Sequence, residues 1–185
     1  MLKLLPGSTI EADVSRKGAA DALLTPMFLG GGLMLSQVSQ LSGLEPHVIQ
    51  NWVKRGFLTP PVKKRYSRRQ LCRILTINTL RDTLSLERAC SLLSYINGQL
   101  NDESDDTIDD AQLYLLICEV AGRLELTHLT DRNAIAQLCA EILHDYREPF
   151  AGARRRVETA LRVITTAYMA AQLKQEAERL LTHLK

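Results

Sequence analysis

Long hydrophobic runs and paired cysteines are both missing from this chain of 185 residues. No apolar stretch approaches the roughly 20 residues that a membrane-spanning helix needs. The N-terminal stretch carries one cation and too few apolar residues for a signal sequence. The cysteines form no C-x-x-C pair, and each lies in an apolar helical stretch, where a free thiol behaves as a small hydrophobe: Cys72, Cys90, Cys118 and Cys139. We therefore expect a cytoplasmic protein with reduced, buried thiols and no membrane contact.

Catalytic and metal-binding motifs are absent as well. The sequence has no Gly-rich phosphate loop, no H-E-x-x-H and no nucleophile signature. Cys139 and His144 lie close in sequence, but a zinc site needs two more ligands. The acidic segment 102–110 lacks the central glycine and the terminal glutamate of a calcium loop. We expect no enzyme activity, no metal and no cofactor.

Glycine and proline are sparse, and no alternating β-branched run predicts a long strand. Apolar residues recur at helical spacing almost throughout, so the fold class is all-α, mainly helical. The predicted helices cover residues 36–43, 46–55, 67–80, 85–97, 109–126, 131–146 and 153–184. Residues 1–32 are expected to form a flexible, loosely attached arm with a short helix near 12–23. Residues 26–34, with three consecutive glycines, are expected to be a flexible joint.

Acidic residues are missing from one stretch of the chain. Residues 46–81 contain nine Lys or Arg and no Asp or Glu, whereas the rest has 14 basic and 21 acidic residues. Because solvated surfaces usually mix both signs, this asymmetry favours a polyanionic partner. The acidic segment 102–110 is interpreted as a solvated linker whose last acids, Asp109 and Asp110, meet the dipole of the next helix. The alternative interpretation of this segment is a DNA mimic that masks the basic residues of 46–81 within the same chain.

Two short helices joined by SGLEP form a helix-turn-helix pattern. Pro46 suits the first position of the second helix, and Gly56 suits its C-terminal cap. In this motif the second helix lies in the major groove, where Asn or Gln can bind adenine and Lys can bind guanine. Trp52 lies on the apolar stripe and is expected to be buried. The polar face supplies the predicted base readers: His47, Gln50, Asn51 and Lys54.

A basic, proline-broken segment follows the second helix. Residues 59–66 predict a small wing, and Ser67-x-x-Gln70 is a capping box that begins the next helix. Arg68 and Arg69 occupy the first turn of that helix, where cations oppose the helix dipole. Phosphate contacts would offset this cost, so both arginines are predicted to bind DNA.

The stretches GLEPHVIQNWVKRGFLTPP and KKRYSRRQLCRILTINTLRDTLSLERACSLL resemble the DNA-binding domain of MerR-type winged helix-turn-helix regulators. The overall arrangement is also similar to an uncharacterised bacterial family with a MerR-like N-terminal domain. The resemblance covers residues 33–98 and implies a transcriptional regulator that binds double-stranded DNA. It makes Pro46–Arg55 the recognition helix and 59–66 a short wing. The candidate DNA-binding residues are His47, Gln50, Asn51, Lys54, Arg55, Lys63, Lys64, Arg65, Tyr66, Arg68 and Arg69.

The second half of the chain has more apolar helix than a DNA-binding domain of 33–98 needs for its support. We expect residues 99–110 to be an acidic linker and residues 111–185 to form a helical bundle for dimerisation or regulation. Two apolar runs in the helix 153–184 are out of step by one residue, which favours a bundle interface over a long coiled coil. A homodimer would present two recognition helices. The alternative function is a winged-helix adaptor whose basic face binds an acidic protein.

Overall fold

The computed structural model describes residues 3–14, 16–100, 102, 104–124 and 131–183. This part of the chain is mainly helical, as predicted, with one small two-stranded antiparallel sheet. Its elements are β1 (Lys3–Leu4), β2 (Glu11–Ala12), α1 (Ala19–Leu24), the 3-10 helix η1 (Thr25–Phe28), α2 (Leu35–Ser42), α3 (Pro46–Lys54), α4 (Arg68–Leu80), α5 (Leu86–Asn97), α6 (Asp110–Arg123), α7 (Arg132–Ile142) and α8 (Ala153–Thr182). None of the described helices is long and apolar enough to cross a membrane.

The helix ends follow local sequence signals. Ser67 precedes α4, and its Oγ accepts a hydrogen bond from the Gln70 amide at 3.2 Å while the Gln70 side chain accepts one from the Ser67 amide at 2.8 Å. Pro46 is the first residue of α3, and Gly43 ends α2 with a left-handed φ of 68°. These predicted boundaries are confirmed. α7 ends at Ile142, earlier than expected. Residues 125–126 and 184 of the predicted helices lie outside the described residues.

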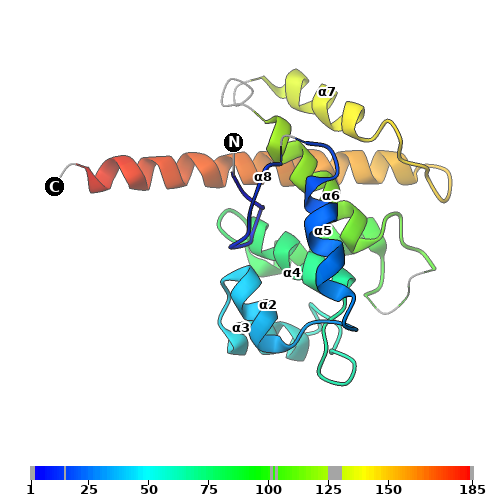
Figure 1. Cartoon of the computed structure of the whole chain (residues 1–185). Coiled ribbons are helices and arrows are strands. Elements are labelled where there is room, and N and C mark those ends of the chain that lie inside the picture. Colours follow the sequence, from blue (N-terminus) through cyan, green and yellow to red (C-terminus); the bar gives the residue numbers. More distant parts are fainter. Residues whose placement is uncertain (1–2, 15, 101, 103, 125–130, 184–185) are drawn as a thin grey trace.

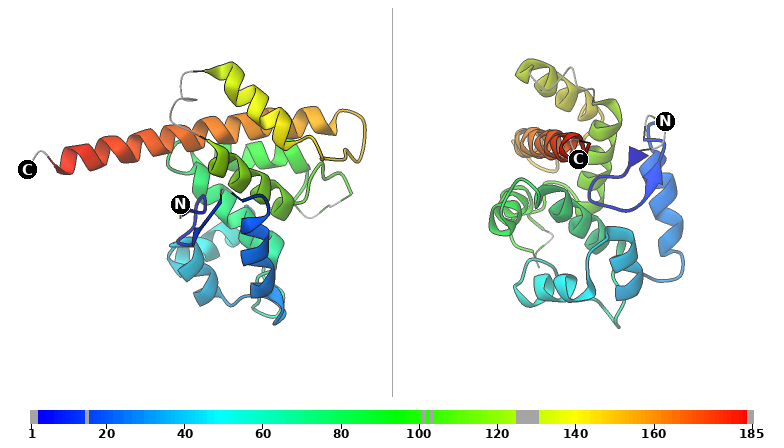
Figure 2. Two further views of the ribbon diagram at one scale, coloured as in Figure 1. Left: turned by 45° about the horizontal axis from the view of Figure 1, so that its top comes forward. Right: turned by 90° about the vertical axis from the view of Figure 1, so that its left-hand side faces the viewer.

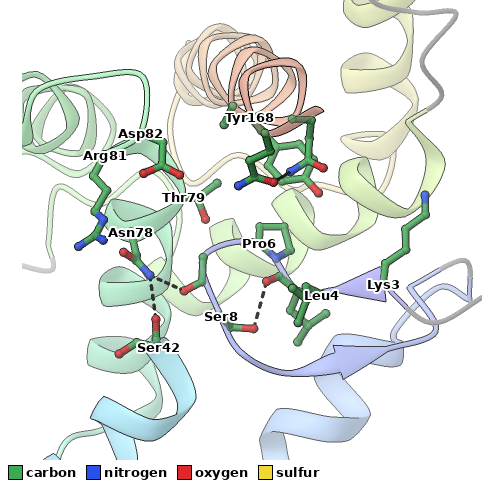
Figure 3. A pocket seen from close by; sticks show the side chains of 15 residues that line it. Lys3, Leu4, Pro6, Ser8, Ser42, Asn78, Thr79, Arg81, Asp82 and Tyr168 are labelled. Carbon is green, nitrogen blue, oxygen red and sulfur yellow. Dashed lines mark hydrogen bonds between the residues drawn. The ribbon is translucent and has the colours of Figure 1, made fainter. Parts of the chain in front are cut away.

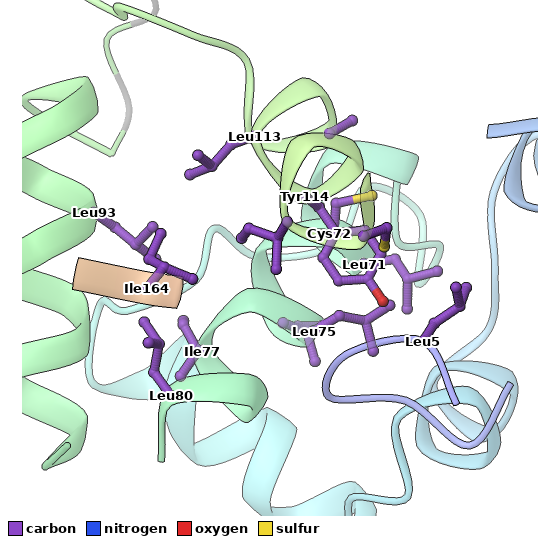
Figure 4. Close-up of a cluster of buried hydrophobic side chains, with 14 of the residues drawn as sticks. Leu5, Leu71, Cys72, Leu75, Ile77, Leu80, Leu93, Leu113, Tyr114 and Ile164 are labelled. Carbon is purple, nitrogen blue, oxygen red and sulfur yellow. The ribbon is translucent and has the colours of Figure 1, made fainter. Parts of the chain in front are cut away.

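Helix α4 is the centre of the core. All of its residues from Gln70 to Leu80 except Asn78 are buried, and the helix packs against α2, α5, α6 and α8. Figure 4 shows side chains of α4 meeting Tyr114 of α6 and, toward the other end of the helix, Leu93 of α5 and Ile164 of α8. All four cysteines are free and buried, as predicted. One hydrophobic cluster therefore runs through the predicted DNA-binding, linker and C-terminal regions.

The N-terminal residues are part of this core, so the prediction of a loosely attached arm does not hold for residues 3–14 and 16–24. Leu5 is 1 % exposed, and the Tyr114 hydroxyl donates to the Pro6 carbonyl at 2.8 Å. Gly7 lies so close to α4 that a Cβ on it would be 2.2 Å from the Leu75 carbonyl oxygen. Single side chains and backbone contacts fix this segment, and such contacts leave no periodicity in the sequence. Residues 1 and 2 of the predicted arm lie outside the described part.

The elements that carry the candidate site lie at one end of the molecule. Figure 1 shows α2, α3 and the loop before α4 at the bottom, with α7 at the top and α8 crossing between them. The first half of α8 packs against α4, α5, α6 and α7, and its C-terminal half extends beyond the other helices (Figures 1 and 2). The body of the protein thus supports α3 from one side only.

Candidate nucleic-acid interface

Helix α3 separates its two faces cleanly. Ile49 and Trp52 are 0 % and 3 % exposed and face the core, which confirms the predicted burial of the tryptophan. The predicted base readers are spaced to share the opposite face, and all of them are exposed: His47, Gln50, Asn51 and Lys54. The arrangement presents two side-chain amides, an imidazole and an ammonium group on one short, firmly supported helix.

Arg55, just after α3, has internal partners. Its Nη2 lies 2.6 Å from Oε1 of Glu87, and its guanidinium stacks 4.6 Å from the centroid of the Phe57 ring. The guanidinium thereby links the end of α3 to the start of α5. A phosphate contact by Arg55 would compete with Glu87, so this residue is less accessible to a ligand than the α3 side chains.

The basic loop, residues 59–66, contains a tight hairpin. Val62 and Arg65 exchange two backbone hydrogen bonds, of 3.1 and 2.9 Å, across a two-residue tip. The tip residues Lys63 and Lys64 have φ angles of 49° and 63°, a conformation that such turns usually give to Asn-Gly. A left-handed conformation costs an ordinary residue about 1–2 kcal/mol. Both lysines are exposed, and neither has a carboxylate partner in the described part of the chain.

The base of the loop is anchored to the segment before α2. Tyr66 and Leu33 exchange backbone hydrogen bonds of 2.7 and 2.9 Å, and Arg65 Nη1 donates to the Gly32 carbonyl at 2.9 Å. Gly32 has a φ of 103°, and a Cβ there would lie 2.9 Å from the Tyr66 carbonyl oxygen. The predicted glycine joint is thus a close backbone contact at Gly32.

Tyr66 does not present its side chain at the surface. It is only 3 % exposed, and burial raises the pKa of its hydroxyl. The predicted role in holding the base of the wing agrees with this position, whereas a phosphate contact by the side chain does not. The physical reason is the pairing with Leu33, which directs the ring into the core beneath the loop.

Arg68 and Arg69 have carboxylate partners within the protein. Arg68 pairs with Asp21 of α1, and Arg69 Nη2 lies 2.5 Å from Oδ2 of Asp106. Arg69 Nε is also 3.5 Å from Oδ2 of Asp110. The cost of placing cations at a helix N-terminus is therefore offset by acids from the same chain, and phosphate contacts are not needed to explain it.

The acidic segment is correspondingly less solvated than predicted. The side chains of Asp106 and Asp110 are 11 % and 2 % exposed, and burial raises the pKa of both carboxyls although Arg69 and Arg73 act in the opposite direction. Asp109 behaves as expected, since its Oδ1 accepts from the Ala111 amide at 2.8 Å at the start of α6. The segment from Asp106 onward is thus a docked part of the fold.

Sequence reasoning missed Asp21, Asp106 and Arg73 as members of this network. Two local signals existed: the acidic segment 102–110, whose alternative role was to mask the basic residues, and an arginine, Arg73, inside the apolar run of α4. Its partners are distant in sequence: Arg73 Nε donates to the Phe57 carbonyl at 3.0 Å, and its Nη1 contacts Asp110. Because the pairing depends on how α4 meets α6, a sequence pattern cannot assign it.

Two concave regions lie near the two ends of α4. One, of about 600 Å³, lies between the basic loop and the start of α4 and includes Arg65, Arg68 and Arg69 in its lining. The other, of about 430 Å³, lies between the N-terminal hairpin, the end of α4 and α8 (Figure 3). Here the Asn78 amide donates to the carbonyls of Gly7 and Ser42, which joins the arm to α2.

Across the described residues, no group of three or more His, Cys, Asp or Glu side chains is placed to hold a metal.

The basic surface consists of Lys54, Lys63, Lys64 and Arg65, the last of which also donates to the Gly32 carbonyl. They are exposed, and no carboxylate pairs with them among the described residues. The basic surface adjoins the polar face of α3, since Lys54 belongs to both. Chemically it offers charge-assisted hydrogen-bond donors beside amides that can both donate and accept.

Residues 32–116 match the model of a family described as "Domain of unknown function (DUF1836)". The match extends from the segment before α2 into α6, so it includes α3, the basic loop and both sides of the Arg69–Asp106 contact. No curated protein matches the chain, and no solved structure matches it.

Proposed function

We propose that the chain binds double-stranded DNA as a winged helix-turn-helix protein and regulates transcription. In this proposal α2 is the supporting helix, α3 is the recognition helix, and the basic loop is a short wing. The observation that carries the proposal is the tip of this loop, where two adjacent lysines occupy left-handed conformations without a carboxylate partner in the described structure. Backbone strain of this kind persists where the side chains have a use that a less strained sequence would not serve.

In this proposal the polar face of α3 contacts the bases, and the basic loop contacts the phosphates. Gln50 and Asn51 carry amides that can form paired hydrogen bonds with adenine, and Lys54 can donate to guanine. Lys63 and Lys64 would then hold the phosphate backbone and fix the position of α3 in the groove. Arg68 and Arg69 are not needed as ligands in this arrangement, because their ion pairs orient α4 beneath the loop.

Selection from a pool of random duplexes tests the proposal against the protein-adaptor alternative. We expect the intact chain to enrich a defined base sequence. Asn51→Ala should relax the preference at one base position, by about 1–3 kcal/mol, while Lys64→Ala should weaken binding to all duplexes alike. Failure to enrich any sequence, together with binding to an acidic polypeptide that duplex DNA does not compete with, would favour the adaptor.

A further inference from the structure

The exposed side of α8 carries a second apolar stripe. Its members follow alternating steps of three and four residues, and all are exposed: Val163, Thr166, Ala170, Leu173, Ala177 and Leu180. They occupy the a and d positions of a heptad, and no charged residue interrupts them. The stripe extends over about 26 Å at 1.5 Å per residue. We call this set of residues the α8 seam.

The structure explains why the two apolar runs of this helix are out of step. The earlier run, which includes Val157, Leu161 and Ile164, is fully buried against the protein's own helices. The later run, which begins at Leu173, belongs to a different face that continues back to Val163. In the right-hand view of Figure 2, which looks along α8, the packed helices leave one side of α8 open. The heptad is therefore continuous on the exposed side.

Support for α8 ends abruptly within the helix. Ala171 is buried, whereas every residue from Gln172 to His183 is exposed. An isolated segment of this length is only marginally helical in water, so packing by another chain would stabilise it. Lys174, Glu176, Glu178 and Arg179 keep the flanks polar and argue against a lipid surface.

One antiparallel register both covers the α8 seam and supports the exposed C-terminal half of α8. A two-fold axis between Ala171 and Gln172 lays each unsupported half on the supported half of a second copy. In this register Val163 faces Leu180 of the second copy, Thr166 faces Ala177, and Ala170 faces Leu173. The central layers thus pair a small residue with a larger or similar one, as well-packed interfaces require. Moving the axis half a heptad toward the C-terminus, to residue 175, would set Val163 and Thr166 opposite positions past the end of α8 at Thr182, so this part of the seam would stay uncovered.

We infer that a second copy of this chain covers the α8 seam in an antiparallel pair centred between Ala171 and Gln172. The pairing is argued from α8 alone. Only its consequence, two copies of α3 available for two half-sites, rests on the proposed function.

Sedimentation of the intact chain at micromolar concentration tests the pairing without DNA. We expect twice the monomer mass of 20.7 kDa. Leu173→Glu with Leu180→Glu should raise the dissociation constant about 100-fold or more, because it places charges in the seam. Gln175→Glu with Thr182→Glu adds the same charge off the seam and should leave the dimer intact. Both pairs lie in the exposed segment, so circular dichroism should report folded protein in each case. A monomeric intact chain, or equal effects of the two variants, would overturn the inference.

Disulfide cross-linking tests the orientation. Val163→Cys and Leu180→Cys should form a cross-link only when the two variant proteins are mixed, since they face each other across the pair. Position 163 of one copy would be about 25 Å from position 163 of the other along the axis. The four native thiols are buried and serve as an internal control in the parent chain. Cross-linking of either variant with itself, without mixing, would indicate a parallel pair and contradict the register.

Discussion

Arg73 of α4 and Asp110 of α6 form a buried ion pair, with Arg73 Nη1 3.3 Å from Oδ1 of Asp110 and side-chain exposures of 7 % and 2 %. Arg73 also holds the Phe57 carbonyl, so this contact joins the segment after α3 to the C-terminal half of the chain. Burial raises the pKa of Asp110 despite the opposing effect of Arg73, which means that desolvation outweighs the attraction. The pair therefore fixes how α4 and α6 meet more than it adds net stability.

The first prediction follows from this balance. Asp110→Asn should lower the free energy of unfolding by about 3–5 kcal/mol, because it leaves Arg73 buried without its counter-charge. The combined change Arg73→Met with Asp110→Leu should cost less than Asp110→Asn alone. Urea unfolding measures both, with the exposed Asp82→Asn as the matched control. A double variant as unstable as the single one would show that the pair contributes net stability.

The strained tip of the basic loop gives a second prediction. Lys63→Asn with Lys64→Gly should stabilise the protein by about 1–2 kcal/mol, since the new residues suit the left-handed conformation. Binding to duplex DNA should weaken at the same time. Lys63→Gln with Lys64→Gln removes the same charges without relieving the strain, so it should weaken binding without raising stability. Equal unfolding free energies for the two variants would contradict the strain argument.

A third prediction concerns the support beneath α3. Trp52 is 3 % exposed, so Trp52→Ala should reduce the free energy of unfolding by about 3–5 kcal/mol through lost burial and the cavity left behind. Tyr95→Ala, at a residue that is 48 % exposed, is the control and should have a small effect. A Trp52→Ala protein with unchanged stability and lost DNA binding would instead place the indole in the interface.

The buried thiols give a fourth prediction, on alkaline pH. Burial raises the pKa of Cys72 and Cys118 to about 12, from an ordinary value of 9.0. Above pH 9 the unfolded thiols lose protons that the folded ones keep, so the folded state is stabilised less as the pH rises. The free energy of unfolding should fall with a slope that approaches about 1.4 kcal/mol per pH unit for each thiol as the pH rises above 9. Unfolding curves between pH 8 and pH 10 should follow the onset of this fall.

The comparison is the variant with Cys72→Ala and Cys118→Ala, whose stability should depend less on pH over the same range. An identical slope in the parent and the double variant would show that these thiols are not responsible. Tyr114, whose pKa burial also raises well above 10.0, adds to the slope at the upper end in both proteins.

Local chemistry made much of the helical part predictable. The capping box at Ser67 and Gln70 and the break at Gly43 are encoded within a few residues, and the structure confirms them. The burial of Trp52 follows from helical periodicity in the same way. The basic segment was visible because nine cations occur without an acid between residues 46 and 81.

Contacts between distant segments were not predictable. The ion pair of Arg69 with Asp106 depends on the packing of α4 against α6, and the docking of Leu5 depends on a short hairpin without hydrophobic periodicity. The same limit applies to α8. The sequence shows its two apolar runs, but only the structure shows that the run containing Leu161 is buried in the protein's own core. The sequence therefore showed where the cations are, and the structure showed which of them pair with carboxylates of the same chain and which are exposed without such a partner among the described residues.

The salt dependence of duplex binding is the most direct test of DNA recognition by the basic surface. For the parent chain, the logarithm of the binding constant should fall linearly with the logarithm of salt concentration, by about 0.9 per phosphate contact. Lys63→Ala, Lys64→Ala and Arg65→Ala together should weaken binding and reduce this slope by roughly one unit per lost contact. The matched control, Arg16→Ala, Arg88→Ala and Arg147→Ala, removes the same charge from exposed positions elsewhere and should retain the slope. Equal affinity and equal slope in the two triple variants would contradict the account.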